Sequence, residues 1–126
     1  MSWRDEYKNV SDLIGKTITS IENKDNYELI FHTEEGLNYK MYHDQDCCES
    51  VSIEDICGDL NNLIGSPIVM AEETTNSDNP KDPEWDKSFT WTFYNFATAK
   101  GYVTIRWYGT SNGYYSEGVD FVLLTT

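Results

Sequence analysis

The sequence predicts an α+β domain in which two helices cover one face of an antiparallel sheet of about six or seven strands. Two segments place apolar residues at helical spacing, and several short runs alternate apolar with polar residues between glycine or asparagine turns. A length of 126 residues suits one domain, and the 14% of aromatic residues argues against disorder. We therefore expect a single domain over residues 1–126.

The first element is an amphipathic helix over 3–14. Apolar side chains recur there at helical spacing, namely Trp3, Tyr7, Val10 and Ile14. Gly15 follows directly and is expected to end the helix.

A small antiparallel meander is predicted next, within residues 16–42. Its strands are expected at 16–22, 27–33 and 37–42, with polar turns at 24–26 and 34–36.

A second helix is predicted over 53–64. Ser52 lies three residues before Asp55, which is a weak helix-start signal, and Gly65 is expected to end the helix. The apolar positions again have helical spacing, namely Ile53, Ile56, Leu60, Leu63 and Ile64.

The remaining strands are expected within 67–124, interrupted by an exposed, mobile loop over 74–87. That loop contains Pro80 and Pro83 and shows no periodicity. The expected strands lie at 67–73, 88–98, 102–108 and 117–124.

Two segments resemble each other fifty residues apart. Asp12-Leu-Ile-Gly-Lys-Thr-Ile18 and Asn62-Leu-Ile-Gly-Ser-Pro-Ile68 each read as a helix end, a glycine and a strand start. Two copies of a helix-then-meander unit explain this likeness, and so does independent use of glycine as a helix stop.

The charge is strongly negative, with 9 basic and 22 acidic side chains and a net charge of −13. Residues 41–86 hold 12 acidic and one basic side chain, a net −11. Direct binding to nucleic acid is not expected, because it needs an excess of lysine and arginine. The acidic segment predicts a solubilising surface, an imitation of nucleic-acid phosphates or a divalent-cation site.

Neither a signal peptide nor a membrane span is expected, so we expect a cytoplasmic protein. The three cysteines form an odd set that fits free thiols in a reducing compartment. A disulfide between the adjacent Cys47 and Cys48 is not expected, because it closes a strained ring.

A cluster of metal-capable side chains lies between the meander and the second predicted helix. The candidate ligands are His43, Asp44, Asp46 and Cys47, with Cys48, Glu49 and Cys57 nearby in sequence. Their spacing is poor for structural zinc and for calcium. A cysteine nucleophile beside His43 and an ordinary loop remain the other two interpretations.

A candidate binding platform lies on the strand 102–108. Alternation assigns Val103, Ile105 and Trp107 to the core, and Arg106 and Tyr108 to the opposite face with Tyr102 and Thr104. An arginine among aromatic rings suits an anionic ligand, with the rings stacking on a base or sugar. The other interpretation is an ion pair between Arg106 and Glu117 or Asp120.

The neighbouring strand and loop add further candidates. Trp91 alternates with Thr92, and Tyr94 is a candidate neighbour of Arg106 across the strand pair. Asn112 begins an Asn-Gly turn, and Tyr114 follows it as a partly exposed ring. The predicted ligand-binding set is thus Trp91, Tyr94, Arg106, Tyr108, Asn112 and Tyr114.

Several motifs resemble a family of small uncharacterised proteins that is frequent in bacteriophage genomes. They are HDQDCCESV at 43–51, WTFY at 91–94, and IRWYG at 105–109 with SNGYYSE at 111–117. The resemblance covers roughly residues 12–124. It implies a phage or prophage protein of the host cytoplasm and supplies no family activity.

Neither a catalytic triad nor a phosphate-binding loop is recognisable in the sequence, so an enzyme is the weaker class. We expect no cofactor. The leading hypothesis is a homo-oligomeric antagonist of host defence that sequesters a nucleotide-derived signal. The first alternative is an acidic inhibitor of a host nuclease, and the second is a metal- or cysteine-dependent hydrolase.

Overall fold

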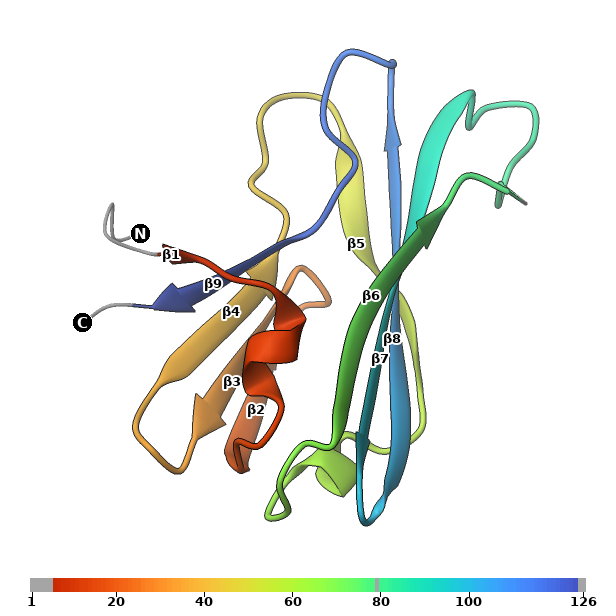
Figure 1. Cartoon of the computed structure of the whole chain (residues 1–126). Coiled ribbons are helices and arrows are strands. Elements are labelled where there is room, and N and C mark those ends of the chain that lie inside the picture. The colour runs from red at the N-terminus through yellow and green to blue at the C-terminus, as the bar shows by residue number, and fades with distance from the viewer. Residues whose placement is uncertain (1–5, 79, 125–126) are drawn as a thin grey trace.

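The computed structural model describes residues 6–78 and 80–124 and consists almost entirely of β-strands. Two antiparallel sheets lie face to face, which is a β-sandwich arrangement (Figure 1). The elements in chain order are β1 (Glu6–Tyr7), η1 (Val10–Leu13), β2 (Ile18–Lys24), β3 (Glu28–Thr33), β4 (Asn38–Tyr42), β5 (Ser50–Cys57), η2 (Leu60–Leu63), β6 (Met70–Asn76), β7 (Ser88–Thr98), β8 (Gly101–Ser111) and β9 (Asp120–Leu124).

The predicted α+β class is wrong. The only helices among the described residues are the 3-10 turns η1 and η2, of four residues each. The expected single sheet is also replaced by two. The first sheet has the strand order β1-β9-β4-β3-β2, and the second has the order β5-β8-β7-β6.

The helix predicted over 3–14 is reduced to η1, and its residues 3–5 lie outside the described part of the chain. Residues Glu6–Tyr7 are extended and pair with β9. The side chain of Asn9 accepts a hydrogen bond from the Ser11 amide at 2.9 Å, so the helical turn begins only after Asn9. With Gly15 at φ 88°, too few residues remain between these signals for a stable α-helix.

The helix predicted over 53–64 is instead the end of β5 followed by η2. The pairing of β5 with β8 shifts by one residue between Ile53 and Asp55, which marks a β-bulge. The bulge returns Ile56 to the same face as Ile53, so a strand acquires the spacing of three that is typical of a helix. The β-branched residues Val51, Ile53 and Ile56 favour the strand.

The predicted meander at 16–42 corresponds to β2, β3 and β4, and the long strands at 88–98 and 102–108 correspond to β7 and β8. β6 continues to Asn76 and therefore occupies the start of the predicted loop 74–87. The mobility of the rest of that loop stays a prediction.

The two similar sequence segments form equivalent structures. η1 and η2 both start at a side-chain cap, Asn9 or Asp59, and both precede a glycine of positive φ, Gly15 (88°) or Gly65 (87°). The Gly15 amide donates to the Ile68 carbonyl at 2.8 Å, and the Gly65 amide donates to the Ile18 carbonyl at 2.9 Å. These two bonds are reciprocal, because Gly65 lies fifty residues after Gly15 and Ile68 lies fifty residues after Ile18, so each glycine bonds to the isoleucine of the other segment.

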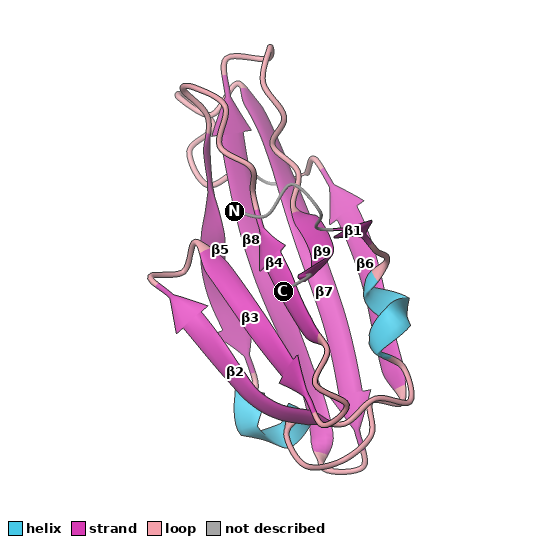
Figure 2. Cartoon of the chain, turned by 90° about the vertical axis from the view of Figure 1, so that its left-hand side faces the viewer, coloured by secondary structure: helices cyan, strands magenta, loops and turns pink. Residues whose placement is uncertain are grey.

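The strand order has the same internal symmetry. β4 leads into β5, which joins the second sheet beside β8, and β8 leads into β9, which joins the first sheet beside β4 (Figure 2). Apart from β1 at the edge of the first sheet, each sheet therefore holds three consecutive strands of one half of the chain and the last strand of the other half. The helix-then-meander unit considered from the sequence is therefore wrong, because the two halves share a 3-10 turn followed by strands.

A single apolar cluster fills the space between the sheets. Phe31 of β3 and Phe96 of β7 have ring centres 5.9 Å apart, and the Trp107 indole of β8 donates to the Met41 sulfur of β4 at 3.3 Å. All four side chains are fully buried. The core leaves the outer face of each sheet available for other roles.

Candidate ligand-binding site

The outer face of the second sheet carries the predicted platform. Val103, Ile105 and Trp107 point into the core, so the alternating residues Arg106 and Tyr108 lie on the outer face, as predicted. Antiparallel pairing places Phe93 of β7 opposite Arg106 and Trp91 opposite Tyr108.

The aromatic rings of this face contact one another. Trp91 and Phe93 stack with ring centres 6.1 Å apart, and Trp91 lies 4.5 Å from the Tyr108 ring. Phe89 continues the row, with its ring centre 6.0 Å from that of Tyr108. Such a row of rings on an outer sheet face is typical of a binding surface.

Arg106 lies beside the Trp91 and Phe93 end of this row. Its Cζ is 5.2 Å from the Trp91 ring centre, which is a cation–π contact. Its Nε is 2.8 Å from Asp55 Oδ1, but the buried Nε–H forms no hydrogen bond, so the contact is an ion pair with poor hydrogen-bond alignment. The ion pair predicted with Glu117 or Asp120 is not formed, because Asp55 is the partner of Arg106.

A pocket of about 170 Å³ opens beside the arginine. Its lining combines two rings, a guanidinium, an amide and a carboxylate, namely Trp91, Phe93, Arg106, Asn76 and Asp78. Within the described residues, no hydrogen bond occupies the terminal Nη groups of Arg106 or the carboxylate of Asp78. The pocket therefore offers both donors and acceptors between aromatic surfaces.

The first sheet provides an internal comparison, because it has the same strand arrangement and a different outer face. Glu28 lies 3.8 Å from the Lys40 ammonium and 3.9 Å from that of Lys24. His32 contacts Glu22, and this hydrogen bond raises the pKa of the histidine. Charged pairs thus cover the first sheet where rings cover the second, which marks the second face as the specialised one.

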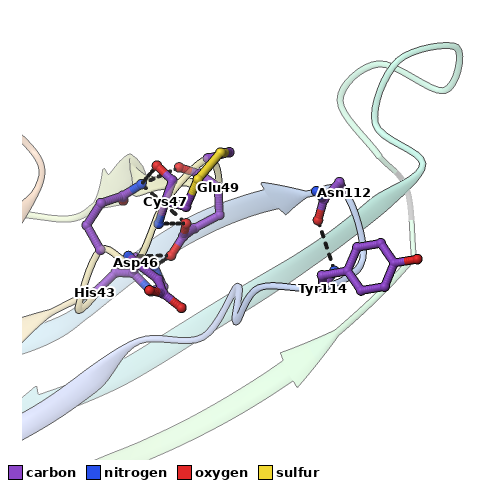
Figure 3. Close-up of a disulfide and its surroundings, with 8 residues drawn as sticks. His43, Asp46, Cys47, Glu49, Asn112 and Tyr114 are labelled. Carbon is purple, nitrogen blue, oxygen red and sulfur yellow. Dashed lines mark hydrogen bonds and ion pairs between the residues drawn. A yellow bond between two sulfur atoms is a disulfide. The ribbon is translucent and has the colours of Figure 1, made fainter.

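Tyr94 does not join the platform, since its side chain is fully buried on the inner face opposite Ile105. Burial is the main cause that raises its pKa, and its hydroxyl donates to the Val119 carbonyl at 3.4 Å. Asn112 accepts from the Tyr114 amide at 3.0 Å within a turn, and Tyr114 is 89% exposed (Figure 3). Three of the six predicted residues, Trp91, Arg106 and Tyr108, are therefore brought together.

Tyr108 anchors the segment after Pro80. Its hydroxyl donates to Asp86 at 2.6 Å and accepts from the Lys81 amide at 3.0 Å. Burial, followed by the Asp86 contact, raises the pKa of Tyr108 to about 12. A second pocket of about 360 Å³ lies here, lined by the carboxylates of Glu54, Asp82 and Asp86 among other groups.

The predicted metal cluster forms a different structure. Glu49 is buried and accepts from the amides of Asp46 and Cys47, both at 2.9 Å, and its Oε2 lies 2.7 Å from His43 Nε2 (Figure 3). His43 Nδ1 lies 2.7 Å from the Gly118 carbonyl. The His43 side chain therefore joins the β4–β5 connection to the β8–β9 connection. These are the two segments that cross between the sheets.

Both partners of the His43 ring are acceptors, so both ring nitrogens donate when the ring is protonated. Burial opposes ionisation of Glu49, but the hydrogen bonds from Cys47, His43 and Asp46 outweigh it and lower the pKa of Glu49 to about 2. The pair is an internal brace for the crossing connections.

Cys47 and Cys48 are joined by a disulfide, so the expectation of two free thiols there is wrong. The sequence argument considered this disulfide only as a bond that stabilises the fold. A disulfide between adjacent residues closes a very short loop and therefore restrains the unfolded chain little. Cys57 is free and exposed. Over 6–78 and 80–124, no three histidine, cysteine or acidic side chains gather as a metal-ligand set, and Asp44 joins no such group.

We expect the Glu49 brace to show in the acid stability of the protein. Because the folded pKa lies near 2 and the ordinary value is 4.5, the contribution is complete above pH 4.5 and is lost as the pH falls towards 2. Urea unfolding of wild type and Glu49→Gln at several pH values measures this. The variant should be less stable at pH 7, and the difference should shrink below pH 4.5.

The exposed Glu34→Gln variant is the control and should follow the wild type throughout. A difference between wild type and Glu49→Gln that stays constant from pH 7 to pH 2 would contradict the assigned ionisation.

Sequence reasoning missed Asn76, Asp78 and Asp55 as members of the arginine site. Asp55 was assigned to a helix, and the other two to a loop. Their proximity depends on the pairing of β5 with β8 and of β6 with β7. Phe93 could have been predicted as a member of the site, because it lies two residues after Trp91 on the same strand and therefore on the same face.

Fold and site together define a two-sheet β protein with an aromatic outer face and a small polar pocket. The family model described as "Domain of unknown function (DUF7448)" matches residues 11–121, and the chain belongs to this family. No curated protein and no solved structure matches the chain. Among the described residues, no helix has the length and apolar character needed to cross a membrane.

Proposed function

We propose that this protein is a non-enzymatic binding protein that sequesters a small nucleotide-like molecule at Trp91, Phe93 and Arg106. The observation that carries the proposal is the Arg106 guanidinium, held 5.2 Å from the Trp91 ring with its Nη groups unbonded within the described chain. Aromatic rings stack on bases of any sequence, and the guanidinium supplies directional donors.

The local charge shapes this proposal. Asp55 balances Arg106, and the chain carries a net charge of −13, so a phosphate gains little on approaching this face. The ring of the ligand therefore supplies most of the contact, and its phosphates stay in solvent.

The lining of the pocket suits binding more than catalysis, because it offers rings, an amide, a guanidinium and one carboxylate. Sequestration needs only affinity and a sufficient amount of protein. It fits the role of a phage antagonist of host defence in the host cytoplasm, which forms part of the proposal.

The test is a binding screen of the purified protein against AMP, GMP, ADP-ribose and cyclic di- and trinucleotides. At least one compound should raise the melting temperature, because a ligand that binds only the folded state stabilises it. Arg106→Gln should weaken that ligand by about tenfold or more in calorimetry, since charge-assisted hydrogen bonds are lost.

Lys24→Gln is the matched control, because it removes one positive charge from the first sheet and should leave the affinity unchanged. Equal binding by Arg106→Gln, or no binding of any compound, would overturn the proposal.

The second candidate function is an acidic inhibitor of a nucleic-acid-binding host enzyme. The carboxylates of Glu54, Asp82 and Asp86 favour it, because they line one open pocket beside the aromatic row. In this case, Asp82→Lys combined with Asp86→Lys should abolish inhibition of a nuclease, whereas Arg106→Gln should retain it.

A further inference from the structure

We infer that the pocket beside Arg106 selects a guanine base, with the guanidinium and Asp78 reading its two hydrogen-bonding edges. This inference rests on the proposed function and names the ligand class of the same site. Guanine presents the acceptors O6 and N7 on one edge and the donors N1–H and N2–H₂ on another.

Arg106 supplies the donors for the first edge. Its Nε lies 2.8 Å from Asp55 Oδ1 in an ion pair, while the Nη groups have no hydrogen bond within the described chain. Two adjacent N–H donors match the O6 and N7 pair of guanine. Adenine offers N7 beside an amino group, and that amino group would face the guanidinium with a donor.

Asp78 supplies the acceptor for the second edge. The Asp78 amide donates to the Asn76 side chain at 3.2 Å, which holds the backbone turn after β6, and the Asp78 carboxylate carries no hydrogen bond within the described chain. A carboxylate accepts from N1–H and N2–H₂ together, as it accepts from a guanidinium. An acid beside an arginine in one pocket therefore matches a ligand with paired donors and paired acceptors.

The size of the pocket agrees with a base as the bound group. Its volume of about 170 Å³ is below the roughly 300–1,000 Å³ of typical sites for whole ligands. The Trp91 and Phe93 rings, stacked with an interplanar angle of 14°, provide flat contact surfaces for a planar base. An uncharged base also avoids repulsion by the acidic protein.

The experiment compares guanosine, adenosine, inosine and 7-deazaguanosine by calorimetry, with GMP and AMP as phosphorylated counterparts. Guanosine should bind at least roughly tenfold more tightly than adenosine, because one bidentate contact discriminates by about that factor or more. Inosine lacks the N2 amino group and 7-deazaguanosine lacks N7, so each should bind more weakly than guanosine.

Asp78→Asn should weaken guanosine more than inosine, because inosine makes one contact fewer to this carboxylate. Glu84→Gln is the matched control, since it neutralises an exposed acid of the neighbouring segment and should leave guanosine binding unchanged. Circular dichroism and melting temperature establish that each variant is folded.

The outcomes separate the two proposals. Adenosine binding as tightly as guanosine, with loss in Arg106→Gln, would overturn guanine selection and leave the proposed function standing. Unchanged guanosine binding by folded Asp78→Asn would also overturn the inference. If none of the six compounds binds, guanine selection fails, and the cyclic nucleotides and ADP-ribose of the previous screen then decide the proposed function.

Discussion

Replacing Trp107 with alanine should lower the free energy of unfolding by about 3–5 kcal/mol. The indole is fully buried between the sheets and donates to the Met41 sulfur of the opposite sheet at 3.3 Å. Alanine would leave a large cavity and remove a contact that joins the two layers. Since domains of this size have about 5–15 kcal/mol in total, urea unfolding should show a much lower midpoint.

Trp85→Ala is the matched control, because Trp85 is 78% exposed and its loss should leave the midpoint unchanged. Trp107→Phe keeps most of the volume and serves if the alanine variant does not fold. A wild-type midpoint for Trp107→Phe and Trp107→Ala alike would mean that the sheets do not pack through this residue.

Replacing Gly109 with alanine should destabilise the protein by about 1–3 kcal/mol or more. A Cβ at Gly109 would lie 2.6 Å from the Glu117 carbonyl oxygen and 3.0 Å from a methyl carbon of Val51. The β8–β9 connection is held close to β8, because the Glu117 carboxylate accepts hydrogen bonds at 2.6–2.8 Å from Ser88, Thr90 and Ser111. It therefore cannot shift to make room for the added Cβ without breaking these bonds.

Gly118→Ala is the control within the same connection, because the nearest atom to its added Cβ lies at an ordinary 3.6 Å. Thermal melts of both variants make the comparison. Equal melting temperatures for Gly109→Ala and Gly118→Ala would contradict the close approach of the connection to β8.

The sequence predicts the strands of this protein better than its helices. In β8, the alternation of Val103, Ile105 and Trp107 with Arg106 and Tyr108 correctly separates the two faces, because side chains of a strand alternate without exception unless a bulge intervenes. In β5, a bulge does intervene, and the resulting spacing of Ile53 and Ile56 imitates a helix. Periodicity alone cannot distinguish these two causes.

Only the residues of the arginine site that lie on β7 and β8 could be predicted from the sequence. β7 and β8 are joined by a tight turn, so Trp91, Arg106 and Tyr108 follow from local pairing. Asp55 lies on β5, and Asp78 follows the end of β6. The sequence does not reveal that these strands flank β7 and β8, because that arrangement depends on where the chain crosses between the sheets. Tyr94 was misplaced because both faces of β7 carry aromatic rings.

The repeat shows the same division between local and long-range information. The glycine at each 3-10 turn is visible in the sequence, as is the likeness of the flanking residues. The exchange of β5 and β9 between sheets is a long-range event with no local signature, and it changes one predicted sheet into two.

The most direct test of the account is an NMR titration of the ¹⁵N-labelled protein with GMP, followed through backbone amides and indole N–H signals. We predict that the perturbed signals cluster on β7 and β8 around Trp91, Phe93 and Arg106, while the equivalent strands β3 and β4 remain unchanged. Perturbations centred instead on His43 and Glu49, or spread over the first sheet, would show that the aromatic face of the second sheet is not the binding site.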